Sequence, residues 1–153
     1  MPYADWVGVT RALSTALEEL ADGEFLILGE PFPAPGPRRR LFGRPAEPPP
    51  TRYVQALRTA EILSAECVGA IPLGGTCEMD DPTIDRLRSL GWLTPEESRA
   101  EFGDFTPNFG TYVEQTSAPG LADLMAASLV LIGAEPQSLE LQFSGEGLRA
   151  VSG

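Results

Sequence analysis

The sequence contains no histidine and no lysine, so all 11 of its basic residues are arginines. Histidine is the side chain most used for proton transfer near neutral pH, and lysine supplies Schiff-base chemistry and the phosphate-binding lysine of P-loops. Their absence excludes most common catalytic arrangements. We therefore expect a protein that is not an enzyme and uses no cofactor, the alternative being an enzyme that uses carboxylates or Cys77.

Cysteine is also scarce, since Cys67 and Cys77 are the only two. Two cysteines this far apart, without histidine, do not make a zinc site. Cys67 lies in an apolar segment and is expected to be a small core residue. Cys77 lies in "GGTCEMDD", where we expect a loop and a free thiol, with a Cys67–Cys77 disulfide as the alternative.

Long hydrophobic runs are missing, because none approaches the roughly 20 residues that a membrane-spanning helix needs. The first residues, "MPYADWVGV", lack the basic region, apolar stretch and small-residue cleavage site of a secretion signal. We therefore expect a cytoplasmic protein with no membrane partner. The lysine-free composition, rich in alanine and proline, also indicates a GC-rich bacterial genome.

Positive charge is in the minority, since 22 acidic residues face the 11 arginines and give a net charge of −11. Nucleic-acid binding requires a positive face that neutralises phosphates, so we expect no nucleic-acid partner. The acidic residues gather most densely at Glu78, Asp80, Asp81 and Asp85. Hard cations favour such carboxylates, but the spacing is not that of an EF-hand loop, and we expect a helix N-terminus favoured by the helix dipole.

Residues 31–50 hold eight of the 15 prolines and four of the 11 arginines. Proline has no amide hydrogen and disfavours helix at the residue before it, which predicts a long extended loop. With Glu47 the segment carries a charge of +3, which leaves −14 on the rest of the chain. We expect Arg38, Arg39 and Arg40 to hold this basic segment against the acidic body or a second copy, a disordered insertion being the alternative.

The length of 153 residues fits one domain with one core. We expect the domain over residues 1–143, interrupted by the insertion at 31–50, and a flexible tail at 144–153. Apolar residues three and four apart predict a first helix from Trp6 to near Ala21, and "EFLILGE" predicts a buried strand after it.

Helix and strand patterns continue in the second half of the chain. "EMDDPTIDRLRSLGW" predicts a helix capped by Asp80 or Asp81 and ended by Gly91. "TPEESRAEFG" has the spacing of a capping box from Thr94 to Glu97 and predicts a second short helix. "NFGTYVEQT" and "SLELQF" alternate as strands do, and the apolar segment between them predicts a helix with little exposed face.

The stretch "RYVQALRTAEILSAECVG", residues 52–69, allows two predictions. Helix propensity favours one continuous helix, because strong helix formers dominate it and nothing breaks it. The alternation of its side chains favours a hairpin turning near Ala60, with Leu63 on the face of Tyr53 and Val54 on the other face. A hairpin would also supply partners for the preceding strand.

The order of "FLILGE", "YVQALR", "ILSAECVG" and "IDRLRSLGW", with "GAEP" before "LELQF", resembles the actinobacterial YbjN-like or TY-Chap domains, which are similar to type III secretion chaperones. In that family Tyr-Val-Gln and a later Ala-Glu lie on adjacent strands, here at residues 53–55 and 65–66. Leu-Gly-Trp at residues 90–92 matches the end of the middle helix. The resemblance covers most of residues 6–143 and decides for the hairpin.

The resemblance implies an α+β fold in which an antiparallel sheet of about five strands is covered by helices. This chain departs from the family in its long insertion at residues 31–50 and in the strand that follows its last helix. In function the resemblance implies a non-catalytic protein-binding domain, chaperone-like or adaptor, with a protein or peptide client and a homodimeric state. The alternative is an immunity-type protein whose acidic surface neutralises a basic toxin.

The residues that the resemblance singles out are Gln55, Glu66, Trp92 and Asn108, which together with Arg38, Arg39 and Arg40 are our candidates for partner binding. Each also has an expected structural role. Trp92 should anchor a helix to the sheet through its large apolar area, and Asn108 should begin a turn or a strand. Gln55 and Glu66 should lie on the solvent face of the hairpin.

Overall fold

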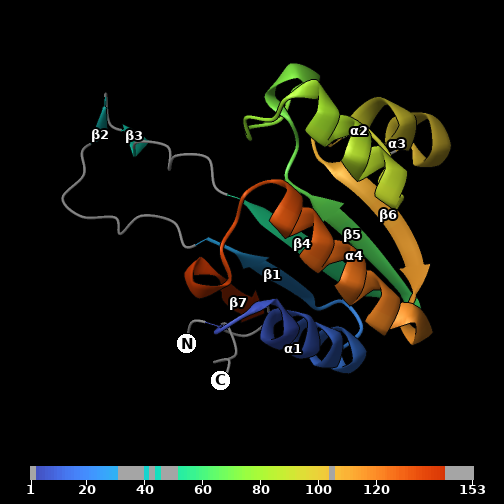
Figure 1. Cartoon of the computed structure of the whole chain (residues 1–153). Coiled ribbons are helices and arrows are strands. Elements are labelled where there is room, and N and C mark those ends of the chain that lie inside the picture. The colour runs from blue at the N-terminus through green and yellow to red at the C-terminus, as the bar shows by residue number, and fades with distance from the viewer. Residues whose placement is uncertain (1–2, 31–39, 42–43, 46–51, 104–105, 144–153) are drawn as a thin grey trace.

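The computed structural model describes residues 3–30, 40–41, 44–45, 52–103 and 106–143. Its strands form an open antiparallel sheet in the order β6-β5-β4-β1-β7, with helices packed on it (Figure 1). The strands of this sheet are β1 (Phe25–Gly29), β4 (Tyr53–Thr59), β5 (Ile62–Cys67), β6 (Phe109–Glu114) and β7 (Glu140–Phe143). The helices are α1 (Trp6–Glu19), α2 (Asp81–Leu90), α3 (Pro95–Phe102) and α4 (Ala118–Leu131). The predicted α+β fold is therefore confirmed.

Shorter elements complete the described parts of the chain. Three single turns of 3-10 helix are η1 (Ile71–Leu73), η2 (Gln115–Ser117) and η3 (Pro136–Ser138). Two short strands, β2 (Arg40–Leu41) and β3 (Arg44–Pro45), pair with each other and not with the main sheet. Among the described residues, no helix is both long enough and apolar enough to cross a membrane.

The hairpin predicted for residues 52–69 is confirmed as β4 and β5. The turn lies at Ala60, which has a φ of 55°, a left-handed conformation that is uncommon outside glycine. Two side chains hold it there: Asp22 accepts a hydrogen bond from the Ala60 N–H (2.8 Å), and Nε of Arg58 donates to the Ala60 carbonyl (2.7 Å). Neighbouring side chains thus stabilise a turn that lacks glycine.

The prediction of which hairpin residues share a face was wrong. The register pairs Val54 with Cys67, Ala56 with Ala65, and Arg58 with Leu63. Directly opposed residues of an antiparallel pair point to the same side of a sheet. Val54 therefore shares a face with Leu63, and Tyr53 lies on the other face.

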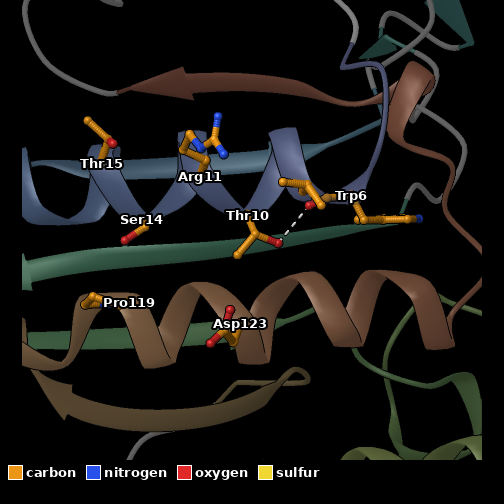
Figure 2. Close-up of a pocket in the computed structure, with 8 residues that line it drawn as sticks. Trp6, Thr10, Arg11, Ser14, Thr15, Pro119 and Asp123 are labelled. Carbon is orange, nitrogen blue, oxygen red and sulfur yellow. Dashed lines mark hydrogen bonds between the residues drawn. The ribbon is translucent and has the colours of Figure 1, made fainter.

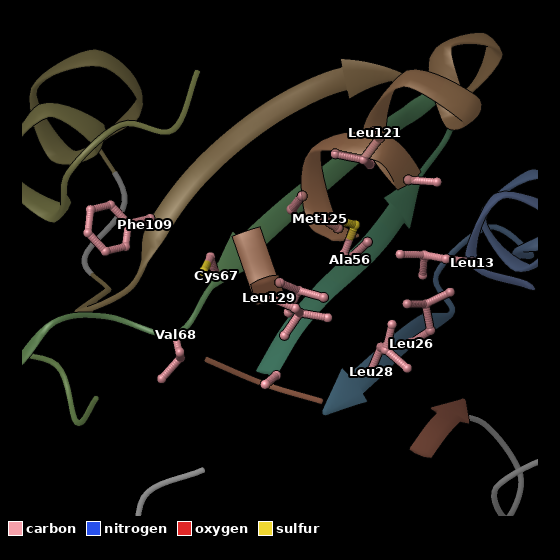
Figure 3. Close-up of a cluster of buried hydrophobic side chains, with 14 of the residues drawn as sticks. Leu13, Leu26, Leu28, Ala56, Cys67, Val68, Phe109, Leu121, Met125 and Leu129 are labelled. Carbon is pink, nitrogen blue, oxygen red and sulfur yellow. The ribbon is translucent and has the colours of Figure 1, made fainter. Parts of the chain in front are cut away.

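The core fills the space between one face of the sheet and the helices α1 and α4, which lie side by side across it (Figure 1). Figure 3 shows apolar side chains from both layers meeting there, among them Leu13 of α1, Leu26 of β1 and Met125 of α4. Cys67 lies in this core, as predicted, and burial raises the pKa of its thiol. Cys77 is also buried, and both cysteines are free thiols.

The helix ends predicted in the second half of the chain are confirmed. Asp80 caps α2 by accepting from the Thr83 N–H (3.0 Å), and Gly91 ends that helix. Thr94 and Glu97 form the capping box of α3. The carboxylate of Glu97 also accepts a hydrogen bond from Arg88 of α2 (2.6 Å). This hydrogen bond is the main reason why the pKa of Glu97 is lowered to about 2. The described residues contain no group of carboxylates or cysteines placed to hold a metal ion.

Strand β7 is the predicted strand after the last helix, and it pairs with β1. The basic segment leaves β1 after Glu30 and returns at Arg52. These two residues are joined by an ion pair (2.8 Å), and Nε of Arg52 also donates to the Ile132 carbonyl at the end of α4 (2.8 Å). Arg38, Arg39 and the tail at residues 144–153 lie outside the described residues, and Arg40 begins β2.

Candidate functional site

The side of the sheet opposite α1 and α4 is called the open face below. In the view of Figure 1 it lies behind the sheet. Helix α3 borders it along β6: a Cβ added to Gly110 on this side would lie 3.2 Å from Oγ of Ser98. Phe102 at the end of α3 also contacts Tyr112 of β6, with ring centroids 4.1 Å apart. The open face is therefore bounded on one side by a helix.

One half of the open face carries an apolar patch, which is defined by Phe25, Leu57 and Ile62. These side chains are 39%, 40% and 39% exposed. Phe25 lies directly opposite Leu57 on the neighbouring strand. Leu57 lies opposite Ser64, which places Ile62 diagonally beside it on β5. Three strands thus contribute to one apolar surface, the arrangement typical of a binding site.

The other half of the open face carries a polar network centred on the carboxylate of Glu66. Its Oε1 accepts hydrogen bonds from Gln55 (3.2 Å), Asn108 (2.8 Å) and Thr106 (3.3 Å). Asn108 also donates to the hydroxyl of Tyr53 (3.1 Å). Burial raises the pKa of Tyr53; the bond from Asn108 opposes this shift and the charge of Glu66 adds to it. The network fixes the geometry of the sheet at this end.

Asn108 is the buried member of this network and joins it to the loop after β5. Its Oδ1 accepts a hydrogen bond from the N–H of Gly69 (2.9 Å), while its side-chain amide nitrogen donates to Glu66 and Tyr53. Gly69 must be glycine for this contact, because a Cβ there would lie 1.8 Å from the Pro107 carbonyl oxygen. Asn108 precedes β6, which confirms the predicted strand entry and adds a role that the sequence did not reveal.

Trp92 does not lie on the open face. Its side chain is 1% exposed and its Nε1–H donates to Oγ of Ser128 on α4 (2.6 Å). Ser128 in turn donates to the Leu124 carbonyl (2.7 Å). Trp92 therefore anchors the end of α2 to another helix, whereas the sequence predicted an anchor on the sheet. A side chain this buried offers a client almost no surface, and partner binding by Trp92 stays a prediction.

A groove with a volume of about 570 Å³ lies on the opposite side of the molecule, between α1 and α4. Figure 2 shows Thr10 and Ser14 on the side of α1 that faces Asp123 of α4. The hydroxyl of Thr10 donates to the carbonyl of Trp6 (2.8 Å). Apolar and polar side chains share the lining: Trp6, Val7 and Pro119 stand beside hydroxyl and charged groups, and Val7 is 63% exposed. This groove is the alternative candidate site.

The structure thus brings together three of the predicted residues, Gln55, Glu66 and Asn108, at one end of the open face. Sequence reasoning missed the apolar patch and the contribution of Thr106. The alternation of residues 53–59 was the available signal for the patch, since it places Leu57 on the face of Gln55.

A known protein family matches most of this chain. The family model described as "TY-Chap3: T3SS (YopN, CesT) and YbjN peptide-binding chaperone 3" matches residues 2–145. The match confirms the resemblance to YbjN-like and TY-Chap domains that the sequence indicated. No curated protein and no solved structure matches the chain.

Proposed function

The chain belongs to the TY-Chap3 family of T3SS and YbjN peptide-binding chaperones, and from this premise we propose that it binds a segment of a client protein on its open face. Binding needs no catalytic group, and it requires an accessible apolar surface that the folded chain leaves exposed. The observation that carries the proposal is the apolar patch, in which three strands present large side chains that are each about two-fifths exposed.

The energetics favour the patch over the groove between α1 and α4. Covering apolar surface contributes roughly 25 cal/mol for each Å² removed from water, so a client gains most where large apolar side chains adjoin. In the groove, Trp6, Val7 and Pro119 do not form a continuous apolar surface across neighbouring strands but share the lining with the hydroxyls of Thr10 and Ser14 and the charges of Arg11 and Asp123. Polar groups of this kind orient a ligand more than they drive its burial.

We propose that the polar network supports this site from its edge. Gln55 and Glu66 are half-buried on the open face, and the buried Asn108 donates a hydrogen bond to Glu66. A client lying across the sheet would pass from the apolar patch to these side chains. Arg38, Arg39 and Arg40 remain predicted partner-binding residues of the basic segment, and the domain limits of 1–143 and 144–153 remain predictions as well.

The test uses a fluorescein-labelled peptide selected by display from a random library on the full chain. In fluorescence anisotropy, Leu57→Asp combined with Ile62→Asp should weaken binding about 30-fold or more, because two carboxylates would be desolvated in the interface. Val130→Asp is the matched control, since Val130 is 50% exposed on α4 at the other side of the sheet.

A third variant, Ser14→Trp, fills the groove between α1 and α4 and should leave the affinity unchanged. Loss of binding in Ser14→Trp with full binding in the patch variant would move the site to the groove. If selection yields no peptide that binds, the proposed function itself fails.

We also propose that two copies associate through the sheet. In the described part of the chain β7 is the terminal strand and pairs with β1 alone, and such an edge is a template for further pairing. Sedimentation at micromolar concentration should therefore give about twice the monomer mass of 16.4 kDa. A monomer that persists under these conditions removes the homodimer.

Finer predictions from the sequence stay predictions. These are an actinobacterial source, cytoplasmic residence, and the lack of enzymatic activity. The immunity-type alternative is supported by the net charge of −11 alone, and none of the comparisons favours it.

A further inference from the structure

The open face carries negative charge in addition to its apolar patch. The strand residues whose side chains point to this side include three carboxylates, Glu66, Glu114 and Glu140, and no arginine. Glu114 lies directly opposite Ile62 of the patch. Glu140 lies opposite Gly29 on the outermost strand, at the far end of the sheet. Glu140 is thus remote from the patch, whereas Glu66 lies diagonally across from Leu57. Negative charge therefore borders the apolar surface at Glu114 on one end and at Glu66 on the other.

The two arginines of the hairpin segment, Arg52 and Arg58, make their contacts away from this face. Arg58 lies opposite Leu63, hence on the helix-covered side, and its guanidinium donates to the carbonyls of Leu20 (2.7 Å) and Ala60 (2.7 Å). Arg52 is held by Glu30 and by the Ile132 carbonyl. At the turn beside the patch, Glu61 is exposed and adds a further carboxylate.

From this arrangement we infer that the client segment is cationic and amphipathic, with aliphatic or aromatic residues flanked on both sides by arginine or lysine. The inference rests on the proposed function and names the class of client for the same surface. Neighbouring strands lie about 4.8 Å apart, so a basic residue next to a client's apolar residue comes within reach of Glu114 when that apolar residue covers Ile62. An acidic flank at the same place would be repelled, and like charges that meet across an interface suppress wrong partners.

Three labelled peptides test the inference. They share the apolar centre of the display-selected peptide and carry two arginines, two glutamines or two glutamates at each end. At about 0.05 M NaCl the arginine peptide should bind at least about tenfold more tightly than the glutamate peptide. The difference should shrink at about 0.5 M NaCl, where the Debye length falls from roughly 14 to roughly 4 Å.

Matched variants separate the open face from the overall charge. Glu114→Gln with Glu61→Gln removes the two exposed carboxylates next to Ile62 and should reduce the preference for the arginine peptide. Glu18→Gln with Glu19→Gln removes the same charge from exposed positions of α1 and should preserve the preference. Equal effects of the two double variants, or equal affinities for all three peptides, would overturn the inference and leave the proposed function standing. If none of the three peptides binds, the proposed function fails with it.

Discussion

Replacing Trp92 with alanine should lower the free energy of unfolding by about 4 kcal/mol, within the range found when a buried tryptophan is truncated. The side chain is 1% exposed and packs at the junction of α2 and α4, so the substitution leaves a large cavity. It also removes the donor that Ser128 accepts from. In urea denaturation followed by far-ultraviolet circular dichroism, the midpoint should fall without loss of the native spectrum.

Two smaller changes divide this effect into packing and hydrogen bonding. Trp92→Phe keeps most of the ring and loses the indole N–H, and should cost about 1.5 kcal/mol. Ser128→Ala leaves the indole N–H buried without its acceptor and should cost about 2 kcal/mol. A loss under about 1 kcal/mol for Trp92→Ala would show that α2 does not depend on this anchor.

Replacing Asn108 with leucine should lower the free energy of unfolding by about 3 kcal/mol, because several polar groups lose their partner at once. The N–H of Gly69 would be buried without an acceptor, and Glu66 would lose its shortest hydrogen bond in the network. The loss is measured by the same urea titration. Thr106→Val is the comparison: it removes the longer bond to Glu66 (3.3 Å) and the hydroxyl that accepts from the Asn108 N–H (3.2 Å), leaves the side chain of Asn108 in place, and should cost about 1 kcal/mol.

Asn108→Asp gives the same site a dependence on pH. The new carboxylate still accepts from Gly69, but it would stand against Glu66, and two adjacent carboxylates raise the pKa of one of them above its value in the unfolded chain. The folded state then binds a proton more tightly than the unfolded state. The loss in free energy of unfolding caused by Asn108→Asp should therefore be largest at neutral pH and should shrink as the pH falls through the raised pKa. A deficit that grows on acidification would contradict the proposed network.

Local sequence signals predicted the elements of this fold well, because their causes are local. The caps of α2 and α3 depend on Asp80, Thr94 and Glu97, which act within one turn of helix. The hairpin was harder, since helix propensity opposed it. The sheet prevailed because β1 on one side and β6 on the other satisfy the backbone groups of β4 and β5.

The error in the faces of the hairpin has a simple physical cause. Thr59 pairs with Ile62, so the loop consists of Ala60 and Glu61 alone. With a two-residue loop, the sequence numbers of two opposed residues always add up to an odd number. An odd-numbered residue of β4 therefore shares a face with even-numbered residues of β5. A shift of one residue exchanges the two faces, and the turn sets that shift.

Contacts between distant segments explain what the sequence did not reveal at the candidate site. Gln55, Glu66 and Asn108 were chosen from a resemblance, but their mutual hydrogen bonds depend on the pairing of β4 with β5 and of β5 with β6. The apolar patch likewise forms only when Phe25 is brought opposite Leu57. Periodicity within one segment indicates which of its own residues share a face, such as Gln55 and Leu57, but it does not indicate which strands become neighbours.

The most direct test of the account is the position of the bound peptide, read from methyl-labelled nuclear magnetic resonance spectra of the full chain. Ile27 lies opposite Gln55 and hence also on the open face. On addition of the display-selected peptide, the methyl signals of Ile27, Leu57 and Ile62 should shift, while those of Val7 and Val130 stay in place. Val7 and Val130 belong to α1 and α4 on the other side of the sheet. Shifts confined to Val7 and Val130 would contradict binding on the open face.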